Sequence, residues 1–386
     1  MYFLAHGLSD LPVVAFLLLP FNYALAALSC KNERGNAVDW FLIYKLPDIN
    51  EHPSKLVQDG LGFLYMDSES SQWHLSRKSI NASSGHALAY TIKQLYRSRH
   101  KNAYRLLYND HPSKGSVQSY RGHTKGVQLF NRNSGFWLIH SVPRFPDKES
   151  YFYPGSGSRY GQSFLCVTFD TSSVLGIIAD QLYLYQPTIY DSNLPTHLAR
   201  KFPKLSDVLA GKSARKGTFN RRVSLTSQGG RVFTNFAKHR KWNKDLYVDL
   251  VAPSLQESLM VQSWLNGPGD LASECDREYQ VHNLRQLSPH EIQFTSSKDH
   301  SKWAVSSSAR DPWICIGDIN RQESQFDRGG GTLCFKDASV WLSYKNAAAV
   351  LEDCPTSGAS DLVNPFDRIS ELLCTVADKV TDFFGS

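Results

Sequence analysis

Apolar and polar residues alternate along the chain with two different periods, and this mixture predicts an α/β (α+β mixed) fold. Short runs enriched in β-branched and aromatic residues predict strands at Trp40–Leu46, Gly62–Met66, Gly135–His140, Phe164–Phe169, Leu246–Val251, Glu291–Thr295 and Trp313–Ile319. Helical spacing predicts three helices, one after Ser84, one from a capping box at Ser254 and Glu257 to near Gly267, and one over residues 365–382. The polar, basic stretch around residues 200–230 is interpreted as a connection between two halves.

The first residues have the pattern of a secretory signal peptide, which we place at residues 1–27. The run from Leu11 to Leu19 is almost wholly apolar, and Ala24-Leu25-Ala26 offers small residues where cleavage would fall. This run is shorter than the roughly 20 apolar residues that span a bilayer, so we expect a mature protein without a membrane segment. Residues 1–30 contain no Lys or Arg, and the usual basic start of such a peptide is therefore missing.

The length of 386 residues is enough for two halves with a large core, which we place at residues 28–200 and 201–386. The formal net charge is +6 with the 13 histidines neutral. Because an ordinary imidazole has a pKa of about 6.5, acid adds further positive charge. The composition therefore favours binding of a polyanion, more tightly in an acidic compartment.

The cysteines support a route through the secretory pathway. None of the seven lies in a C-x-x-C or zinc-ligand spacing; they are Cys30, Cys166, Cys275, Cys315, Cys334, Cys354 and Cys374. Widely separated cysteines that follow a signal peptide predict disulfides, and the odd number leaves one over. Asn81-Ala82-Ser83 is a glycosylation sequon. We therefore expect a lysosomal or secreted protein with a glycan at Asn81.

A repeated His-x-Lys unit is the candidate chemistry of the chain. His123-Thr124-Lys125 and His300-Ser301-Lys302 each follow an irregular polar stretch and precede a β-rich run, one in each half. A third copy, His239-Arg240-Lys241, lies in a basic run interpreted as surface. Residues i and i+2 of a strand share one face. Two such strands that meet across a pseudo-two-fold axis would bring two imidazoles together, flanked by two ammonium groups.

Two imidazoles and two ammonium groups suffice to cleave a phosphodiester. One neutral imidazole attacks phosphorus and forms a phosphohistidine, while the other, protonated, donates its proton to the leaving oxygen. The ammonium groups stabilise the charge on the non-bridging oxygens, so the reaction requires no metal and no other cofactor. Water then hydrolyses the intermediate. Since the imidazoles need opposite protonation states, we expect coupled titrations and a bell-shaped pH profile.

The paired His-x-Lys units resemble the phospholipase D superfamily, and the sequence around them is similar to deoxyribonuclease II in particular. The similar stretches run in order from about residue 29 to about residue 354, and they are Val38–Phe41, Tyr44–Pro47, Gly122–Gly126, Gly135–Pro146, Tyr160–Gln162, Asp299–Trp303, Gly317–Arg321 and Arg328–Cys334. The wider superfamily places an Asp five residues after each motif lysine, where this chain has Phe130 and Ser307. This departure fits deoxyribonuclease II and argues against phospholipase activity.

The resemblance implies a phospholipase D-like pseudodimer of two sheet-and-helix halves, each contributing one His-x-Lys motif. It implies an acid, metal-independent endonuclease that acts on double-stranded DNA and leaves 3′-phosphate and 5′-hydroxyl ends. By motif match the catalytic residues are His123, Lys125, His300 and Lys302, with His140 and Asn320 as supporting residues. We assign His123 as nucleophile and His300 as acid, and the sequence allows the reverse.

The resemblance also implies how the cysteines pair: Cys30 with Cys166, Cys275 with Cys354, and Cys315 with Cys334. Cys374 is then left over, either as a buried thiol, which we favour, or as a bridge between two chains. The protein is accordingly expected to be a monomer or a homodimer.

Two clusters of interleaved basic and aromatic residues are candidate DNA contacts. The first contains Arg97, Arg99 and Lys101, and the second contains Lys238, Arg240 and Lys241. A solvated helix and a surface loop are the alternatives for these clusters. Two other functions stay open for the whole chain. One is a secreted deoxyribonuclease II-like protein that binds DNA or a host partner without cutting, and the other is a phosphodiesterase of lipid head groups.

Overall fold

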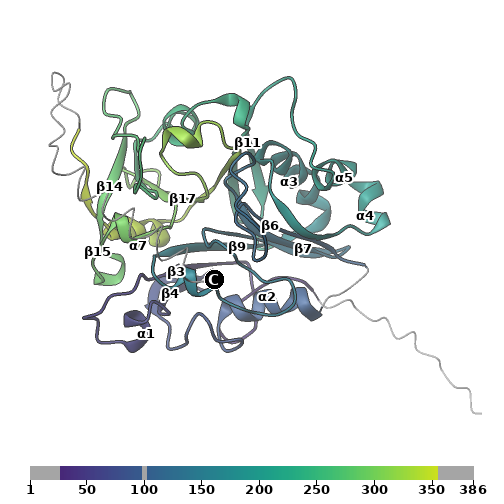
Figure 1. The fold of residues 1–386 in the computed structure, drawn as a ribbon, viewed down its shortest axis with the longest axis horizontal. Coiled ribbons are helices and arrows are strands. Elements are labelled where there is room, and N and C mark those ends of the chain that lie inside the picture. Colours follow the sequence, from purple (N-terminus) through teal and green to yellow (C-terminus); the bar gives the residue numbers. More distant parts are fainter. Residues whose placement is uncertain (1–26, 98–101, 355–386) are drawn as a thin grey trace, which may run out of the picture.

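The structure is a computed structural model that describes residues 27–97 and 102–354 (Figure 1). Eight strands of the first half form an antiparallel sheet in the order β10-β6-β7-β8-β9-β3-β4-β5. Their bounds are β3 Trp40–Lys45, β4 Phe63–Asp67, β5 Ser70–Leu75, β6 Tyr104–Asn109, β7 Lys125–Phe130, β8 Ser134–His140, β9 Gln162–Asp170 and β10 Ile189–Asn193. A small ribbon of β1 (Cys30–Lys31) and β2 (Ala37–Val38) lies beside this sheet.

A second sheet is built from the rest of the described chain, in the order β11-β12-β18-β17-β16-β13-β14-β15, with β19 also paired to β14. Its strands are β11 Asn220–Thr226, β12 Val232–Lys238, β13 Leu259–Gln262, β14 Val281–Leu287, β15 Phe294–Thr295, β16 Trp303–Ser306, β17 Trp313–Gly317, β18 Gly330–Lys336 and β19 Ala348–Leu351. β13 and β14 are parallel, whereas the other neighbours are antiparallel.

Six consecutive strands of the two sheets correspond in order and direction. The run β6-β7-β8-β9-β3-β4 of the first sheet matches β13-β16-β17-β18-β12-β11 of the second, and every pair in both runs is antiparallel. The register agrees as well. Lys45 ends β3 and pairs with Gln162, the first residue of β9, just as Lys238 ends β12 and pairs with Gly330, the first residue of β18.

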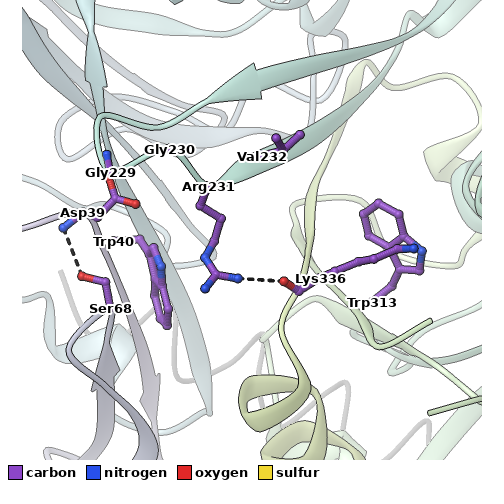
Figure 2. Close-up of a pocket in the computed structure, with 9 residues that line it drawn as sticks. All are labelled: Asp39, Trp40, Ser68, Gly229, Gly230, Arg231, Val232, Trp313 and Lys336. Carbon is purple, nitrogen blue, oxygen red and sulfur yellow. Dashed lines mark hydrogen bonds between the residues drawn. The ribbon is translucent and has the colours of Figure 1, made fainter. Parts of the chain in front are cut away.

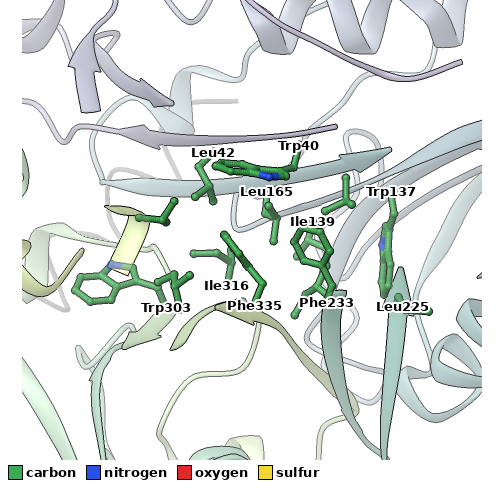
Figure 3. Close-up of a cluster of buried hydrophobic side chains, with 14 of the residues drawn as sticks. Trp40, Leu42, Trp137, Ile139, Leu165, Leu225, Phe233, Trp303, Ile316 and Phe335 are labelled. Atoms are coloured by element: carbon green, nitrogen blue, oxygen red, sulfur yellow. The ribbon is translucent and has the colours of Figure 1, made fainter. Parts of the chain in front are cut away.

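The main core lies between the two sheets. Figure 3 shows Trp40 and Leu165 of the first sheet facing Ile316, Phe233 and Phe335 of the second. Helix α3 (Thr171–Tyr185) contacts strands of both sheets, which explains why it is apolar around most of its circumference. The further α-helices are α1 Lys55–Gln58, α2 Ala87–Arg97, α4 Thr196–Lys201, α5 Pro203–Leu209, α6 Ala252–Leu255 and α7 Ala338–Ala347.

Shorter helical segments cover the outer faces and turns. A π-helix at Tyr247–Val251 continues into α6 and packs on the outer face of the second sheet, while α2 covers the outer face of the first (Figure 1). The 3-10 turns are Gly155–Gly157, Arg240–Trp242, Pro289–Glu291, Ser296–Lys298 and Glu323–Gln325. In the described ranges, no helix combines the length and hydrophobicity that a membrane crossing requires.

All four strands predicted in the first sheet, the strand at Trp313 and the helix after Ser84 are confirmed. The strand predicted at Leu246–Val251 is wrong, because this short apolar run forms the π-helix, and such a run does not by itself distinguish a buried helix from a strand. The helix predicted from Ser254 to Gly267 is also wrong. The observed helix α6 ends at Leu255, before Gln256, whose φ is 56°. Strand β13 then follows within the second sheet.

The remaining predicted elements differ in extent. Of Glu291–Thr295 only Phe294 and Thr295 form a strand, since the preceding residues make a 3-10 turn with positive φ at His290 and Glu291. The connection at residues 200–230 contains α5 and also β11, the edge strand of the second sheet. The signal peptide, Cys374 and the helix predicted over 365–382 lie outside the described residues.

The three disulfides are confirmed: Cys30–Cys166, Cys275–Cys354 and Cys315–Cys334. The first ties β1 to β9, and the third joins directly opposed residues of β17 and β18. Each half of the protein thus has its own covalent restraint attached to a strand of its main sheet, as expected for a chain that folds in an oxidising compartment.

Candidate active site

The two His-x-Lys motifs enter corresponding strands, and each is held by the opposite half. Lys125 is the first residue of β7, and Lys302 directly precedes β16. The backbone N–H of His123 donates to the carbonyl oxygen of Gly329 at 2.9 Å, and that of His300 donates to the carbonyl oxygen of Gly161 at 2.9 Å. These two hydrogen bonds cross between the halves, and each of them attaches one candidate histidine to the other half of the molecule.

The two acceptor residues are glycines because the halves approach closely there. A Cβ on Gly161 would lie 2.3 Å from Oδ1 of Asp299, and a Cβ on Gly329 would lie 2.3 Å from the carbonyl oxygen of Tyr185. Both separations are far shorter than van der Waals contact, so any larger residue would force the motif away from its support.

The charges of the two motifs act on each other, so the four residues lie close enough to interact electrostatically. Burial, then Lys302, Lys125 and His123, hold the pKa of His300 well below its usual range. Burial, then Lys125, with a smaller contribution from Lys302, lower the pKa of His123 in the same direction. The pKa of Lys302 falls to about 7, mainly through burial and also through the charge of Lys125.

A carboxylate lies beside the first motif. The ammonium of Lys125 donates to Oδ1 of Asp110, and Nε2 of His123 lies 3.8 Å from Oδ2 of the same side chain. Arg328, from the second half, donates to that Oδ2 at 3.1 Å. Burial opposes ionisation of Asp110, but the charges of Lys125, His123 and Arg328 outweigh it, and its pKa lies well below the usual range.

The imidazole of His123 has a defined tautomer. Its Nδ1 lies 2.5 Å from the backbone carbonyl oxygen of Asp318, and since a carbonyl oxygen only accepts, Nδ1 carries the hydrogen. Nε2 then carries the lone pair. Thr124, the middle residue of the motif, donates its hydroxyl to the Asp318 carboxyl group, whose pKa burial raises to about 7.

Aromatic rings surround the second histidine instead. The ring of His300 stacks on Tyr160 with centroids 5.4 Å apart, and it meets Trp264 edge-on with centroids 4.0 Å apart. The ammonium of Lys302 donates to the carbonyl oxygen of His300 at 2.6 Å. Ser301 donates its hydroxyl to Asp299 at 2.6 Å, so the middle residue of this motif is also anchored to a buried carboxyl group.

Asp110 and Trp264 occupy the same place in the two sheets. Asn109, at the end of β6, pairs with Lys125, and Asp110 is the next residue. Gln262, at the end of β13, pairs with Trp303, and the antiparallel register places Ser263 opposite Lys302 and Trp264 one residue beyond. One histidine of the site therefore faces a carboxylate at the position where the other faces an indole.

Comparison with known proteins agrees with this arrangement. Residues 29–354 match the family described as Deoxyribonuclease II. The chain belongs to the deoxyribonuclease II family. It is similar to Deoxyribonuclease-2-alpha of Sus scrofa, with 40% identity over 356 residues that cover 90% of this chain and 95% of that protein.

Two further relatives of the same family come from invertebrates. Cell-death-related nuclease 7 of Caenorhabditis elegans is 38% identical over 349 residues, which cover 90% of this chain and 92% of that protein. Plancitoxin-1 of Acanthaster planci is 38% identical over 334 residues, which cover 85% of this chain and 93% of that protein.

The two residues predicted to support the site lie in different halves of this deoxyribonuclease II family member. His140, at the end of β8, is fully buried between Phe145 and Phe164, and burial together with the charge of Lys125 lowers its pKa to about 3. Asn320 lies in the second half, where its amide donates to the Gln322 side chain at 3.3 Å. His140 is thus a neutral ring near Lys125 at every ordinary pH.

The candidate DNA contacts are placed unequally. Arg97 ends α2, whereas Arg99 and Lys101 lie outside the described residues. Arg240 donates to the carbonyl oxygen of Tyr120 at 3.1 Å, next to the first motif, and Lys241 is exposed. Lys238 is 1% exposed and lies inside the molecule, so the surface that this cluster offers to DNA consists of Arg240 and Lys241.

The third His-x-Lys copy has a local structural role. The ring of His239 is buried and stacks on Phe219, and its Nδ1 accepts a hydrogen bond from the backbone N–H of Lys241 at 3.1 Å. The ring therefore caps the 3-10 turn that follows. Neither of the other two motifs has this arrangement.

A groove that the sequence reasoning missed adjoins the first motif. It has a volume of about 540 Å³, and its lining includes Lys114, Gln118, Tyr120, Arg121, Pro187 and Gly211. Tyr120 is 59% exposed, and the Arg121 guanidinium lies 5.8 Å from the centre of its ring. The signal in the sequence was an aromatic–basic pair directly before Gly122-His123.

Another pocket lies where strands β3 and β12 begin. It has a volume of about 780 Å³ and contains Trp40, which begins β3, and Val232, which begins β12 (Figure 2). Its cations have acidic partners, since Arg231 pairs with Asp337 at 3.0 Å and Lys336 pairs with Asp311. This pocket is remote from both motifs and has no excess of basic groups.

One group of side chains has the spacing of metal ligands in the described part of the chain: Cys275, His282 and Cys354. The two cysteines form a disulfide, and disulfide sulfurs are not the thiolates that bind zinc. The residues present therefore do not fit a zinc centre.

Proposed function

We propose that this chain is an acid, metal-independent endodeoxyribonuclease that hydrolyses the phosphodiesters of double-stranded DNA and leaves 3′-phosphate and 5′-hydroxyl ends. The observation that carries the proposal is the pair of crossed hydrogen bonds, in which each motif histidine is bonded through its backbone to a glycine of the opposite half. Membership of the deoxyribonuclease II family supports the choice of DNA as substrate.

His123 is the nucleophile in this proposal. Its Nδ1–H donates to the Asp318 carbonyl, so the Nε2 lone pair is available to attack phosphorus. The P–O5′ bond breaks, and a phosphohistidine attached to the upstream 3′ oxygen remains. Phosphorylation of Nε2 gives the ring a positive charge, because Nδ1 keeps its hydrogen. The nearby Asp110 carboxylate stabilises that charge.

His300 is the acid that protonates the leaving O5′. It then takes a proton from water, whose oxygen attacks the phosphohistidine and releases the 3′-phosphate. Lys125, Lys302 and Arg328 supply three cationic groups near the phosphate, and these neutralise charge on its non-bridging oxygens.

The lowered pKa values of the histidines account for activity in acid. The acid must be protonated, and because the pKa of His300 lies well below its usual value, the protonated fraction grows only as the pH falls. The nucleophile must be neutral, and because the pKa of His123 is also lowered, it stays neutral further into acid. The rate maximum therefore lies on the acid side of neutrality.

The rest of the proposal concerns architecture and location. The corresponding strands support a phospholipase D-like pseudodimer with halves at residues 28–200 and 201–386. One chain supplies both motifs, so a monomer already contains a complete site, and a homodimer would contain two. The disulfides and the exposed Asn81 sequon support passage through the secretory pathway to a lysosome or to the exterior, after removal of residues 1–27.

The decisive experiment uses supercoiled plasmid in EDTA between pH 4 and 8. We expect the purified protein to nick and linearise the plasmid in acid, and His123→Ala to lose this activity. His290→Asn is the matched control, since His290 is exposed and asparagine tolerates its left-handed backbone. The new 5′ ends should accept phosphate from a kinase without prior dephosphorylation.

An intact plasmid at every pH would overturn the proposal. If the wild-type protein still retarded DNA in a gel under those conditions, a non-cutting DNA-binding protein would be the better account. Cleavage that EDTA abolishes would contradict the metal-independent mechanism.

A further inference from the structure

Two buried lysines outside the His-x-Lys motifs have no part in the mechanism above. Lys45 is 0% exposed and Lys238 is 1% exposed. A buried ammonium is costly unless hydrogen bonds replace its hydration. Burial also lowers the pKa of both groups, that of Lys238 to about 8. The fold retains two unfavourable charges, and each is satisfied in the same unusual way.

Each ammonium group donates to several backbone carbonyl oxygens of one loop, and the two lysines hold different loops. Nζ of Lys45 donates to the carbonyl oxygens of Ser158 and Tyr160, each at 2.5 Å. Nζ of Lys238 donates to three carbonyl oxygens, those of Gln325 at 2.8 Å, Phe326 at 3.0 Å and Arg328 at 2.8 Å. Neither ammonium makes a salt bridge in the described part of the molecule.

The two lysines are equivalent in the two halves. Each is the last residue of its strand, and each pairs with the first residue of the neighbouring strand, as described above for β3 with β9 and β12 with β18. The loops that they hold, residues 158–161 and 325–329, directly precede those neighbouring strands. The arrangement thus recurs in two stretches of sequence that share only the strand-end lysine and the glycine.

Each of these loops ends at the glycine that supports a histidine of the other half. Gly161 accepts the backbone N–H of His300, and Gly329 accepts that of His123. Lys45, in the first half, is therefore connected through one loop to His300. Lys238, in the second half, is connected in the same way to His123.

Side chains on the same loops strengthen each connection. Tyr160, whose carbonyl Lys45 holds, stacks on the His300 ring. Arg328, whose carbonyl Lys238 holds, donates to Asp110 beside His123 and to the carbonyl oxygen of Gly122 at 3.2 Å. The position of the loop therefore sets both the backbone and the immediate surroundings of the histidine.

We propose that Lys45 and Lys238 are positioning residues that fix the histidines of the opposite half, Lys45 acting on His300 and Lys238 acting on His123. The consequences for catalysis rest on the proposed function. Lysine suits this task because its three donors lie on a flexible stem and can gather several carbonyl oxygens at one point. Without the ammonium, these carbonyl oxygens have no hydrogen-bond donor, and the loop changes its conformation to pair them with other donors.

The test replaces each lysine by methionine, which keeps the stem and removes the ammonium. With a short duplex as substrate we expect kcat to fall about 10- to 100-fold, because a displacement of about 1 Å in a reacting group can cost that much. KM should change by less than about threefold, since neither side chain reaches the surface. Lys336→Met is the matched control, as Lys336 lies at the other end of β18 and is exposed.

The readout that distinguishes positioning from mere stability is the titration of individual histidines, followed by NMR with labelled imidazoles. Lys45→Met should displace the resonance and titration of His300 more than those of His123, whereas Lys238→Met should do the reverse. Leu284→Ala, a truncation in the distant core of the second sheet, controls for lost stability and should change neither histidine.

The proposal is overturned if folded methionine variants keep wild-type kcat and both histidine titrations, or if each variant displaces both histidines equally. Where a methionine variant does not fold, Lys45→Gln and Lys238→Gln replace it, because the shorter, neutral amide keeps the position polar but cannot supply the three donors of the ammonium, and the same criteria apply. The NMR measurement does not need DNA cleavage. If the wild-type protein cuts no plasmid, the proposed function fails, and the positioning of the histidines is still decided.

Discussion

The surroundings of the two histidines differ at equivalent positions of two corresponding sheets. His123 faces the carboxylate of Asp110, with Lys125 and Arg328 beside it. His300 faces Trp264 and stacks on Tyr160. The backbone geometry is the same on both sides, down to the glycine that accepts each histidine N–H. A pseudo-symmetric scaffold thus carries an asymmetric site.

This asymmetry indicates a division of roles. A nucleophile that becomes a phosphorylated, cationic ring is stabilised by a fixed neighbouring carboxylate. An acid must release its proton, and a largely apolar aromatic environment that lowers its pKa favours that release. The carboxylate therefore favours His123 as nucleophile and His300 as acid, an assignment that the motifs alone leave open.

The largest expected effect comes from replacing His300 and then supplying a substrate whose leaving group needs no protonation. His300→Ala should lose about 10²- to 10⁴-fold in kcat on ordinary DNA, the range expected for general acid catalysis. A duplex with sulfur in place of the bridging O5′ has a leaving group that needs no proton. His300→Ala should cut this substrate nearly as fast as the wild-type protein, whereas His123→Ala should not.

If His123→Ala, and not His300→Ala, regained cleavage of the sulfur-substituted duplex, the two roles would be reversed. Recovery by neither variant would show that both histidines act before the leaving group departs.

The next effect concerns the carboxylate itself. Asp110→Asn keeps the shape of the side chain but removes its charge from His123, Lys125 and Arg328. We expect kcat to fall about 10²- to 10³-fold, the scale for loss of one electrostatic stabiliser in a buried site. Trp264→Phe, at the equivalent position beside His300, should cost less than about tenfold. Single-turnover assays at saturating duplex measure both, and a larger loss in Trp264→Phe would contradict the assignment.

The two motifs of the candidate site could be picked out from the sequence because each is local. Each motif is three residues long and can be read from the sequence directly, whereas β7 and β16, the strands that the motifs enter, were not among the predicted strands. The partners were not predicted, because they come from remote positions: Arg328 reaches the carbonyl oxygen of Gly122 across 206 residues. Asp110, Lys45 and Lys238 look like ordinary charged residues at strand ends, and only the tertiary fold shows that they are buried.

The errors in the fold have a similar cause. The run at Leu246–Val251 has an apolar composition that fits either a strand or a buried helix, and its packing on the outer face of the second sheet decides the outcome. The capping box at Ser254 predicts the start of a helix, but α6 ends at Leu255, and Leu259–Gln262 pairs with β16 and β14 as a strand between them. Pairing with distant strands overrides the local helical signal.

A smaller effect is expected in the groove beside His123. Arg121→Ala and Tyr120→Ala remove a basic and an aromatic side chain that line this groove on the side of His123. We expect each to raise KM for duplex DNA about 3- to 10-fold with little change in kcat, and Arg121→Ala to reduce the salt dependence of binding by about one counterion. Arg310→Ala is the control, since that exposed residue lies at the far end of β16.

Unchanged KM in both groove variants would place the bound strand elsewhere. A fall in kcat with KM unchanged would mean that these side chains support the motif and do not bind substrate.

The smallest effect concerns a second position at which the halves differ. His140 pairs with Phe164 in the first sheet, where the equivalent Gly317 pairs with Thr332 in the second. Since the folded protein lowers the pKa of His140 to about 3, the unfolded chain takes up a proton below its ordinary pKa of about 6.5 that the folded chain refuses. The free energy of unfolding is therefore unaffected by this group above about pH 6.5, and it decreases as the pH falls from there towards 3.

His140→Phe removes this dependence while keeping an aromatic ring between Phe145 and Phe164. Repacking the larger ring shifts stability by a similar amount at every pH, so the slope is the informative quantity. We expect the loss of unfolding free energy between pH 6.5 and 4.5 to shrink by up to about 1.4 kcal/mol per pH unit. Thermal unfolding across that range measures it, with the wild-type protein as the reference. An unchanged slope in His140→Phe would mean that the buried ring is protonated in the folded protein, and that a site working in acid carries one more positive charge than the geometry indicates.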